Sequence, residues 1–327
     1  MKDITMIIGA NGQLGTEISA ALRELTGTDT VICADLAAPT ATLTEKGPYL
    51  QIDVTDTKAL AEAVSKYRVT HIYHLAALLS ASGEKNPDLA WKVNMEGSLN
   101  VLNLARENKQ IKQIYFPSSI AVFGPNTPIE NTPQFSANDP TTMYGITKYT
   151  GELLCAYYNA KFGVDVRSLR YPGIISWKTP PGGGTTDYAV DTYHHAVNNE
   201  PYTCFLKKDT YLPMMYMPDA IKATFQLMNA PADTLSTRLA YNLTAISFSP
   251  EEQAASIKKY MPDFQISYEP DFRQAIADSW PNSIDDSLAR ADWGWKPDFD
   301  LDAMSRDMLD NLSKLKHHEN NLEAVIG

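Results

Sequence analysis

The chain has 327 residues, of which 44% are hydrophobic, and it carries a formal net charge of −11. This length and composition suit one large α/β domain or up to two domains with an ample core, and they exclude an intrinsically disordered chain. The acidic balance without any Lys/Arg cluster argues against nucleic-acid binding, and no apolar run approaches the ~20 residues of a membrane-spanning helix.

The cysteines and histidines give no sign of a metal site. Cys33, Cys155 and Cys204 lie far apart without a CxxC motif, as expected of small core residues in a reducing compartment. No HExxH motif or Cys/His quartet occurs, and the adjacent His194 and His195 would not share a helical face. We expect no metal and, because the chain opens straight into a predicted strand without a signal peptide, a cytoplasmic protein.

The first predicted strand, residues 4–8, is followed at once by a glycine-rich loop and a helical pattern. This arrangement places a phosphate on the backbone N–H groups of a helix N-terminus. The glycines would permit a tight turn, a close approach of a pyrophosphate, and close packing of helix on strand. A tight turn without a ligand is the alternative. The residues predicted to bind a dinucleotide here are Gly9, Asn11, Gly12, Gln13, Leu14 and Gly15.

The second predicted strand, residues 30–36, ends in Asp35, which lies 20 positions after Gly15. An acidic side chain at this distance accepts hydrogen bonds from the adenosine ribose hydroxyls and repels a 2′-phosphate. The next residues, 36–38, include no arginine that would receive such a phosphate. The pattern therefore favours NAD over NADP, although Asp35 is also typical of a turn that ends a strand.

Apolar runs and helical patterns continue to alternate along the chain. Further strands are predicted at residues 49–54, 71–77, 112–118 and 164–170, and long helices at 87–108 and 142–162. This alternation predicts a doubly wound Rossmann sheet of parallel strands with right-handed crossovers, within a dinucleotide-binding domain over residues 1–172.

Ligands of such sheets bind at the carboxyl ends of the strands. Gly9, Asp35, Asp53, Ala76 and Ser118 all fall at predicted strand ends. Asp53 would meet the adenine amino group or cap the helix that runs to about residue 67.

The regular alternation of predicted strands and helices ends after Pro172. Residues 173–327 predict a smaller, mixed substrate-binding cap interleaved with the first sheet, to which residues 238–245 would contribute. The loop 179–187 is too rich in proline and glycine to form a regular element. Its glycines at 182–184 suggest a loop that closes over a substrate and excludes water.

A candidate catalytic group follows the fifth strand. Tyr144 and Lys148 are four residues apart in a predicted helix, so they share one face. A tyrosine has an ordinary pKa of about 10, and a nearby ammonium lowers it toward the range of a useful base. Ser119, at a neighbouring strand end, would hold a substrate oxygen. An exposed tyrosine–lysine surface pair is the alternative interpretation.

Taken together, these motifs resemble the extended short-chain dehydrogenase/reductases, and the likeness reaches the segment 285–297. The resemblance implies NAD chemistry with Tyr144 as acid/base, Lys148 on the nicotinamide ribose, and Ser119 as the orienting hydroxyl. It adds a set of cofactor-binding positions that match the family's motifs, namely Asp53, Val54, Leu75, Ala76, Ala77, Asn94, Tyr144, Lys148, Tyr171 and Ile174.

Residues 171–176 and 181–190 resemble one subfamily more closely, the short-chain-type L-threonine 3-dehydrogenases, although position 119 is Ser where relatives often have Thr. The resemblance implies oxidation of the β-hydroxyl of L-threonine to 2-amino-3-oxobutyrate, and a homodimer formed through the two long helices. Asp187 would attract the ammonium or cap a helix, and Trp280 would enclose the substrate or pack the cap core. The expected substrate contacts are Ser80, Ser118, Tyr144, Thr185, Thr186, Asp187 and Trp280.

Two other functions remain open on the sequence. A nucleotide-sugar epimerase or dehydratase uses the same scaffold but needs basic cap residues for a pyrophosphate, and the candidates form no cluster (Lys207, Lys208, Arg238, Arg273 and Arg290). A non-catalytic dinucleotide sensor often lacks the tyrosine or the lysine, and both are present in this chain.

Overall fold

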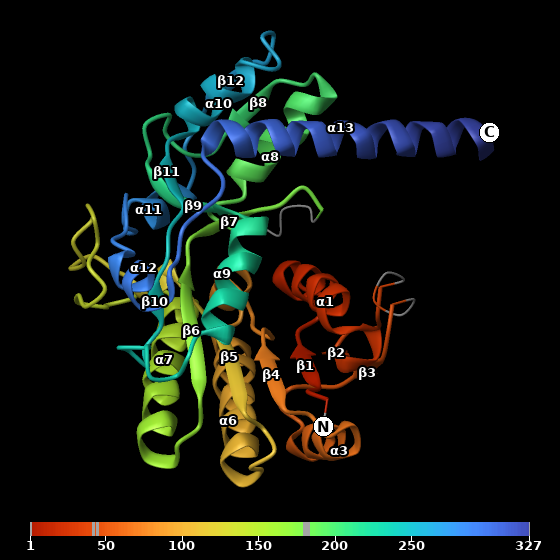
Figure 1. Cartoon of the computed structure of the whole chain (residues 1–327). Coiled ribbons are helices and arrows are strands. Elements are labelled where there is room, and N and C mark those ends of the chain that lie inside the picture. The colour runs from red at the N-terminus through yellow and green to blue at the C-terminus, as the bar shows by residue number, and fades with distance from the viewer. Residues whose placement is uncertain (1, 41–42, 44–45, 179–183, 327) are drawn as a thin grey trace.

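A seven-stranded sheet forms the centre of the molecule (Figure 1), in a computed structural model that describes residues 2–40, 43, 46–178 and 184–326. The strand order is β10-β6-β5-β4-β1-β2-β3, and every neighbouring pair is parallel. The predicted doubly wound sheet is confirmed. The strands are β1 (Thr5–Ile8), β2 (Val31–Asp35), β3 (Tyr49–Gln51), β4 (His71–His74), β5 (Gln113–Ser119), β6 (Val166–Tyr171) and β10 (Tyr241–Asn242).

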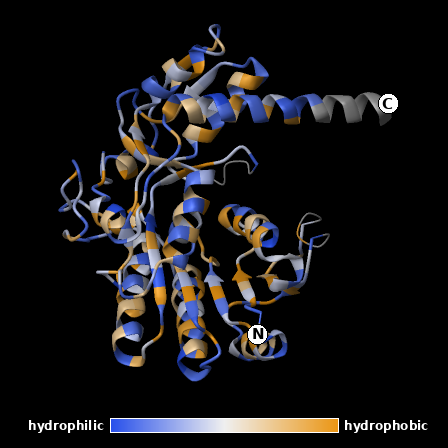
Figure 2. Cartoon of the chain, in the orientation of Figure 1, coloured by the Kyte–Doolittle hydropathy of each residue, from blue (hydrophilic) through white to orange (hydrophobic). Residues whose placement is uncertain are grey.

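Helices cover both faces of this sheet. Successive strand residues point to opposite sides, and because they are hydrophobic both faces must be buried. Ile7 packs in a core cluster with α1 (Gln13–Thr26) and α9 (Met217–Asn229). Its neighbours Met6 and Ile8 pack on the other face, against α3 (Thr57–Tyr67), α6 (Gly97–Glu107) and α7 (Met143–Phe162). Orange hydrophobic segments and blue hydrophilic segments both occur along the strands and along the helices that cover them (Figure 2).

The predicted helix over residues 87–108 is present, and it contains a π-helical turn that the sequence did not predict. It consists of α5 (Pro87–Trp91), a π-helical turn (Lys92–Glu96) and α6. The side chain of Asn94, in the π turn, hydrogen-bonds the backbone of Leu78 and the hydroxyl of Thr147. A short helix not expected from the sequence, α4 (Ser80–Lys85), follows β4. Two 3₁₀ turns, at Thr28–Thr30 and Ile120–Val122, complete this part of the chain.

Beyond residue 172 the chain builds smaller layers above the carboxyl edge of the sheet (Figure 1). One three-stranded sheet contains β7 (Gly173–Ile175), β9 (Leu212–Tyr216) and β11 (Ile246–Phe248), and β8 (Tyr202–Cys204) pairs with β12 (Ile266–Tyr268). The strand β10 returns to the main sheet beside β6. The helices of this region are α8 (Tyr188–Asn198), α10 (Pro250–Lys258), α11 (Arg273–Ala277), α12 (Ser287–Trp293) and α13 (Leu301–Ile326).

The described part of the chain contains no helix with both the length and the hydrophobicity needed to cross a membrane. All three cysteines are free and buried, which agrees with their predicted place in the core.

Candidate active site

One cleft of about 620 Å³ lies at the carboxyl ends of β1, β4 and β5 and is closed on its other side by residues of the smaller layers. It brings together the glycine loop, the catalytic candidates and residues 184–187, the described part of the predicted substrate loop 179–187. The predicted site residues that line it are Gly9, Asn11, Gly12, Gln13, Leu14, Gly15, Leu75, Ala77, Ser80, Ser118, Ser119, Tyr144, Lys148, Tyr171, Ile174, Thr185, Thr186, Asp187 and Trp280.

The three glycines of the loop do different work. Gly9 has φ of +89°, and a Cβ there would lie 2.5 Å from the Ala76 nitrogen. A Cβ on Gly15 would lie 2.2 Å from the Gly9 oxygen, so both positions are closed by the protein itself. A Cβ on Gly12, the N-cap residue of α1, would meet only the Gly9 oxygen, at 3.4 Å. The space at Gly12 therefore suits a phosphate at the start of α1, where backbone N–H groups are available.

Asp35 lies beside this loop rather than in the wall of the cleft. Its Oδ2 accepts a hydrogen bond from the Asn11 backbone N–H at 3.0 Å, and its Oδ1 accepts one from the Ala37 N–H at 3.1 Å. A carboxylate accepts up to about four hydrogen bonds, so capacity remains for ribose hydroxyls. The position at the end of β2 thus fits the adenosine half of NAD.

Four other predicted cofactor residues lie outside the cleft wall. The exposed Asp53 holds a turn, because its Oδ1 accepts hydrogen bonds from the N–H and hydroxyl of Thr55. The cap of α3 comes instead from Asp56, which accepts from the Ala59 N–H. Val54 is buried and packs so closely against Gly97 that a Cβ there would collide with it. The backbone of Ala76 lies directly against Gly9, and Asn94 makes the hydrogen bonds described above.

Ser119, Tyr144 and Lys148 meet at the centre of the cleft, as predicted. Thr142 caps α7 and sets the helix start, so Tyr144 and Lys148 lie on adjacent turns of one face. The Lys148 Nζ is 5.6 Å from the centroid of the Tyr144 ring. It donates a hydrogen bond of 2.8 Å to the carbonyl oxygen of Pro117, a cleft residue for which the sequence gives no signal.

The pKa of Tyr144 differs from the sequence-based expectation. Burial raises this pKa to about 12, and a hydrogen bond with Ser119 opposes the rise only in part. Burial also lowers the pKa of Lys148 to about 8. The expected lowering of the Tyr144 pKa by Lys148 is therefore not seen in the chain alone.

Ser118 and Tyr171 line the cleft, but their hydroxyl groups are bonded within the protein. The Ser118 hydroxyl donates to the Glu152 carboxylate at 2.5 Å, and the residue is only 2% exposed. The Tyr171 hydroxyl is bonded to the hydroxyls of Tyr115 and Thr224. Neither hydroxyl proton is available to a substrate.

The described part of the substrate loop closes one end of the cleft. Asp187 occupies the N-cap position of α8, and its Oδ2 accepts a hydrogen bond of 2.7 Å from the Gly184 N–H. The predicted closing glycines at 182 and 183 lie outside the described residues. Trp280 is 8% exposed, so it packs in the core of the smaller layers and also borders the cleft.

Among the residues that the structure describes, no group of three or more His, Cys, Asp or Glu is arranged to hold a metal ion.

Comparisons with known proteins agree with this geometry. Residues 5–243 match the NAD dependent epimerase/dehydratase family. An uncharacterized epimerase/dehydratase of Staphylococcus saprophyticus is 52% identical over 312 residues, covering 95% of this chain and 97% of that protein. The holo form of a GalE-like L-threonine dehydrogenase from Cupriavidus necator is 55% identical, with a TM-score of 0.91 over 94% of this chain and 99% of that one. The L-threonine dehydrogenase of Phytophthora infestans is 52% identical, with a TM-score of 0.92 over 95% and 99%.

Proposed function

Because the chain belongs to the NAD-dependent epimerase/dehydratase family, we propose that it is an NAD-dependent oxidoreductase that converts L-threonine to 2-amino-3-oxobutyrate. The observation that carries this proposal is the meeting of Ser119, Tyr144 and Lys148 in one cleft with the glycine loop. The L-threonine dehydrogenases that match over nearly the whole chain support the choice of substrate.

The side chains of the cleft divide the reaction between them. Tyr144 takes the proton of the β-hydroxyl, while Ser119, which is hydrogen-bonded to Tyr144, orients the same oxygen. NAD⁺ bound in the cleft would supply the hydride acceptor for Cβ of threonine and a positive charge beside Tyr144. That charge opposes the effect of burial on the pKa of Tyr144. Lys148, which also lines the cleft, would hold the nicotinamide ribose.

The amino-acid end of threonine is held by the rim of the cleft. We assign the carboxylate to hydroxyl and backbone N–H groups of Ser80, Thr185 and Thr186, and the ammonium to Asp187. Trp280 borders the cleft as an apolar wall for the substrate methyl group. The smaller layers beyond residue 172 act as the substrate-binding part in this proposal.

A nucleotide-sugar substrate is less well served by the described residues. The described wall of the cleft includes one lysine, Lys148, and no arginine. The basic residues considered for a pyrophosphate all have acidic partners, in the pairs Lys207–Asp278, Lys208–Glu251, Arg238–Asp165, Arg273–Asp271 and Arg290–Asp286. Threonine needs no such cluster.

The decisive experiment follows NADH at 340 nm with L-threonine and NAD⁺, with NADP⁺ as the cofactor control and UDP-glucose as the competing substrate. We expect threonine-dependent NADH formation and a clear preference for NAD⁺. UDP-glucose turnover without threonine turnover would indicate an epimerase. NAD⁺ binding without turnover of threonine or any other alcohol would indicate a sensor.

We also propose that the protein works as a cytoplasmic homodimer. Ile146, Leu153 and Tyr157 are 38%, 48% and 52% exposed and repeat at helical spacing along α7, which packs beside α6. A second copy placed on this face would cover these side chains. Sedimentation equilibrium tests the dimer, and L153E should shift it toward the monomer. The free, buried cysteines suit a reducing compartment.

A further inference from the structure

A buried ion pair, Glu152 with Arg170, lies directly behind the catalytic end of the cleft. Glu152 is 0% exposed and Arg170 is 1% exposed. The Arg170 Nε donates to the Glu152 Oε1 at 2.9 Å, and a terminal nitrogen donates to Oε2 at 2.7 Å. The bidentate pair joins α7 to β6, and its burial calls for an explanation because such pairs seldom add stability over apolar residues.

The pair also fixes the end of β5. The Glu152 Oε1 accepts a hydrogen bond from Ser118, the residue between Pro117 and Ser119. Pro117 supplies the carbonyl that accepts a hydrogen bond from the Lys148 ammonium, and the Ser119 hydroxyl opposes the effect of burial on the pKa of Tyr144. Adjacent strand residues face opposite ways, so a bond that holds Ser118 inward presents Ser119 to the cleft.

Glu152 also lies one helical turn beyond Lys148 on α7, and its charge favours the protonated lysine. The charged and titratable groups around Lys148 are Tyr144, Glu152 and Cys155 on α7, His74 on β4, and Arg170 on β6. Burial keeps His74 neutral, with a pKa of about 3, and raises the pKa of the Cys155 thiol well above its ordinary value. Glu152 is therefore the negative charge that acts on Lys148 at neutral pH.

The far side of Arg170 reaches the segment that follows Trp280. One terminal nitrogen of Arg170 donates to the Gln134 carbonyl and to the Asn242 side chain. Asn242 in turn donates to the carbonyls of Thr132 and Asp285. The Arg170 guanidinium is thus linked through Glu152 to Ser118 at the end of β5. Through Asn242 it is also linked to Asp285, which follows the cleft residue Trp280 in the chain.

We infer that Glu152, held by Arg170, is a positioning residue for the reaction: it sets the β5 end that carries Ser119 against the α7 turn that carries Tyr144 and Lys148. The role deepens the proposed function and rests on it. Glu152 does not itself line the cleft and, in this proposal, does not touch the substrate, so it acts through Ser118 and Lys148.

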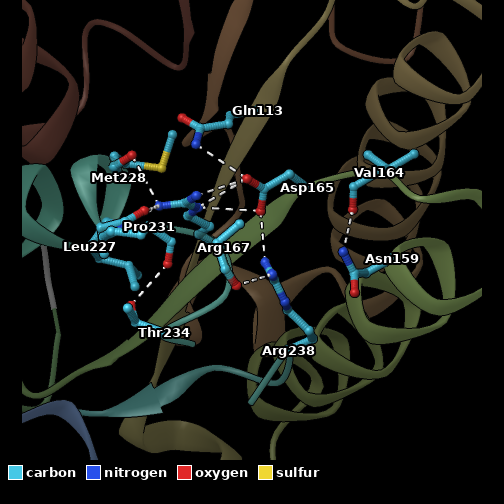
Figure 3. A network of polar contacts seen from close by, with 12 residues as sticks. Gln113, Asn159, Val164, Asp165, Arg167, Leu227, Met228, Pro231, Thr234 and Arg238 are labelled. Atoms are coloured by element: carbon cyan, nitrogen blue, oxygen red, sulfur yellow. Dashed lines mark hydrogen bonds and ion pairs between the residues drawn. The ribbon is translucent and has the colours of Figure 1, made fainter. Parts of the chain in front are cut away.

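The chain offers a matched control on the same strand. Arg167, 4% exposed, pairs with Asp165 near the start of β6, where its guanidinium also donates to carbonyls at the end of α9 (Figure 3). Arg238 pairs with the same aspartate. Ligands of parallel sheets bind at the carboxyl ends of the strands, and Asp165 lies at the other end of β6. D165N therefore removes the acidic partner of a buried arginine without changing the cleft.

The test compares E152Q, S118A and D165N with the wild type. The titration of Lys148 is followed without substrate or cofactor, by NMR of ¹³C-labelled lysine assigned with K148R, and kcat, KM and the NAD⁺ Kd are measured in parallel. In E152Q we expect a lower pKa of Lys148 and a fall in kcat of about tenfold to a hundredfold, with the NAD⁺ Kd within about threefold. D165N should alter thermal stability alone.

An unchanged Lys148 titration in E152Q, or an equal loss of kcat in D165N, would overturn the inference. If E152Q does not fold, S118A tests the inference instead, because it removes the hydrogen bond between Ser118 and Glu152 and leaves the Glu152–Arg170 ion pair in place. A fall in kcat at constant KM supports positioning, whereas a rise in KM alone, or no change, overturns it. A wild type that does not oxidise threonine rejects the proposed function, while the Lys148 titration still judges the role of Glu152.

Discussion

The Lys148 ammonium donates a hydrogen bond of 2.8 Å to the carbonyl oxygen of Pro117, while the centroid of the Tyr144 ring lies 5.6 Å from the same nitrogen. The lysine is thus fixed to the strand next to the catalytic helix, not to the phenol. Burial raises the pKa of Tyr144 to about 12 in the chain alone, and a cationic cofactor beside the phenol would lower it. In the proposed mechanism, proton transfer to Tyr144 therefore takes place only after NAD⁺ has bound.

Replacing Tyr144 by Phe should separate binding from chemistry. The ring still fills its place in the cleft, so the Kd for NAD⁺ should stay within about threefold, while turnover of threonine should fall by about 10²–10⁴-fold. Displacement of fluorescent NADH by NAD⁺ gives the Kd for NAD⁺, and the 340 nm assay gives the turnover. Turnover within tenfold of the wild type would remove Tyr144 from its role as acid/base.

Burial of Lys148 should make the free energy of unfolding depend on pH. Its pKa falls from 10.5 to about 8 on folding because of burial. Between these values the unfolded chain binds a proton that the native state lacks, so stability rises with pH through this window. Relative to K148M, the wild type should gain about 3 kcal/mol in free energy of unfolding between pH 8 and 10.5.

Urea unfolding of both proteins at several pH values measures this difference, and the titration of Tyr144 affects both alike. A stability difference that stays flat with pH would show that Lys148 has its ordinary pKa in the native state.

The glycine loop allows a test with an internal control. A Cβ at Gly12 has ordinary room, so G12A should fold with nearly the wild-type melting temperature but weaken NAD⁺ binding by about tenfold or more, since the methyl enters the phosphate space. A Cβ at Gly15 would lie 2.2 Å from the Gly9 oxygen, so G15A should lose stability as well. Equal NAD⁺ affinity in G12A and the wild type would contradict a pyrophosphate at this turn.

The sheet, and the grouping of the candidate catalytic residues in one cleft, could be predicted from the sequence because both depend on local rules. Alternating strands and helices predict a parallel sheet, and its carboxyl ends collect the ligand-binding residues. The four-residue spacing of Tyr144 and Lys148 places both on one helical face, and the structure puts Ser119 beside them.

Contacts between residues far apart in the chain could not be read from the sequence. Asn94 matched a cofactor position, yet its partners Leu78 and Thr147 are 16 and 53 residues away. Ser118 and Ser119 look alike in sequence, and only the pairing of Ser118 with Glu152, 34 residues later, shows which one faces inward. Glu152 itself gave no signal, because a single acidic residue in a helix is ordinarily solvent-exposed.

Asp35 carries the last prediction, the choice of cofactor. In D35S the charge and one acceptor oxygen are lost, so kcat/KM for NAD⁺ should fall about tenfold to a hundredfold, as for a hydrogen bond to a charged group, and discrimination against NADP⁺ should shrink. Asp35 also accepts hydrogen bonds from the N–H groups of Asn11 and Ala37, so a loss of activity alone would be ambiguous. D35N is the control, because it retains an acceptor oxygen without the charge. If the ratio of kcat/KM for NAD⁺ and NADP⁺ stays at the wild-type value in both variants, the preference for NAD⁺ does not come from this carboxylate.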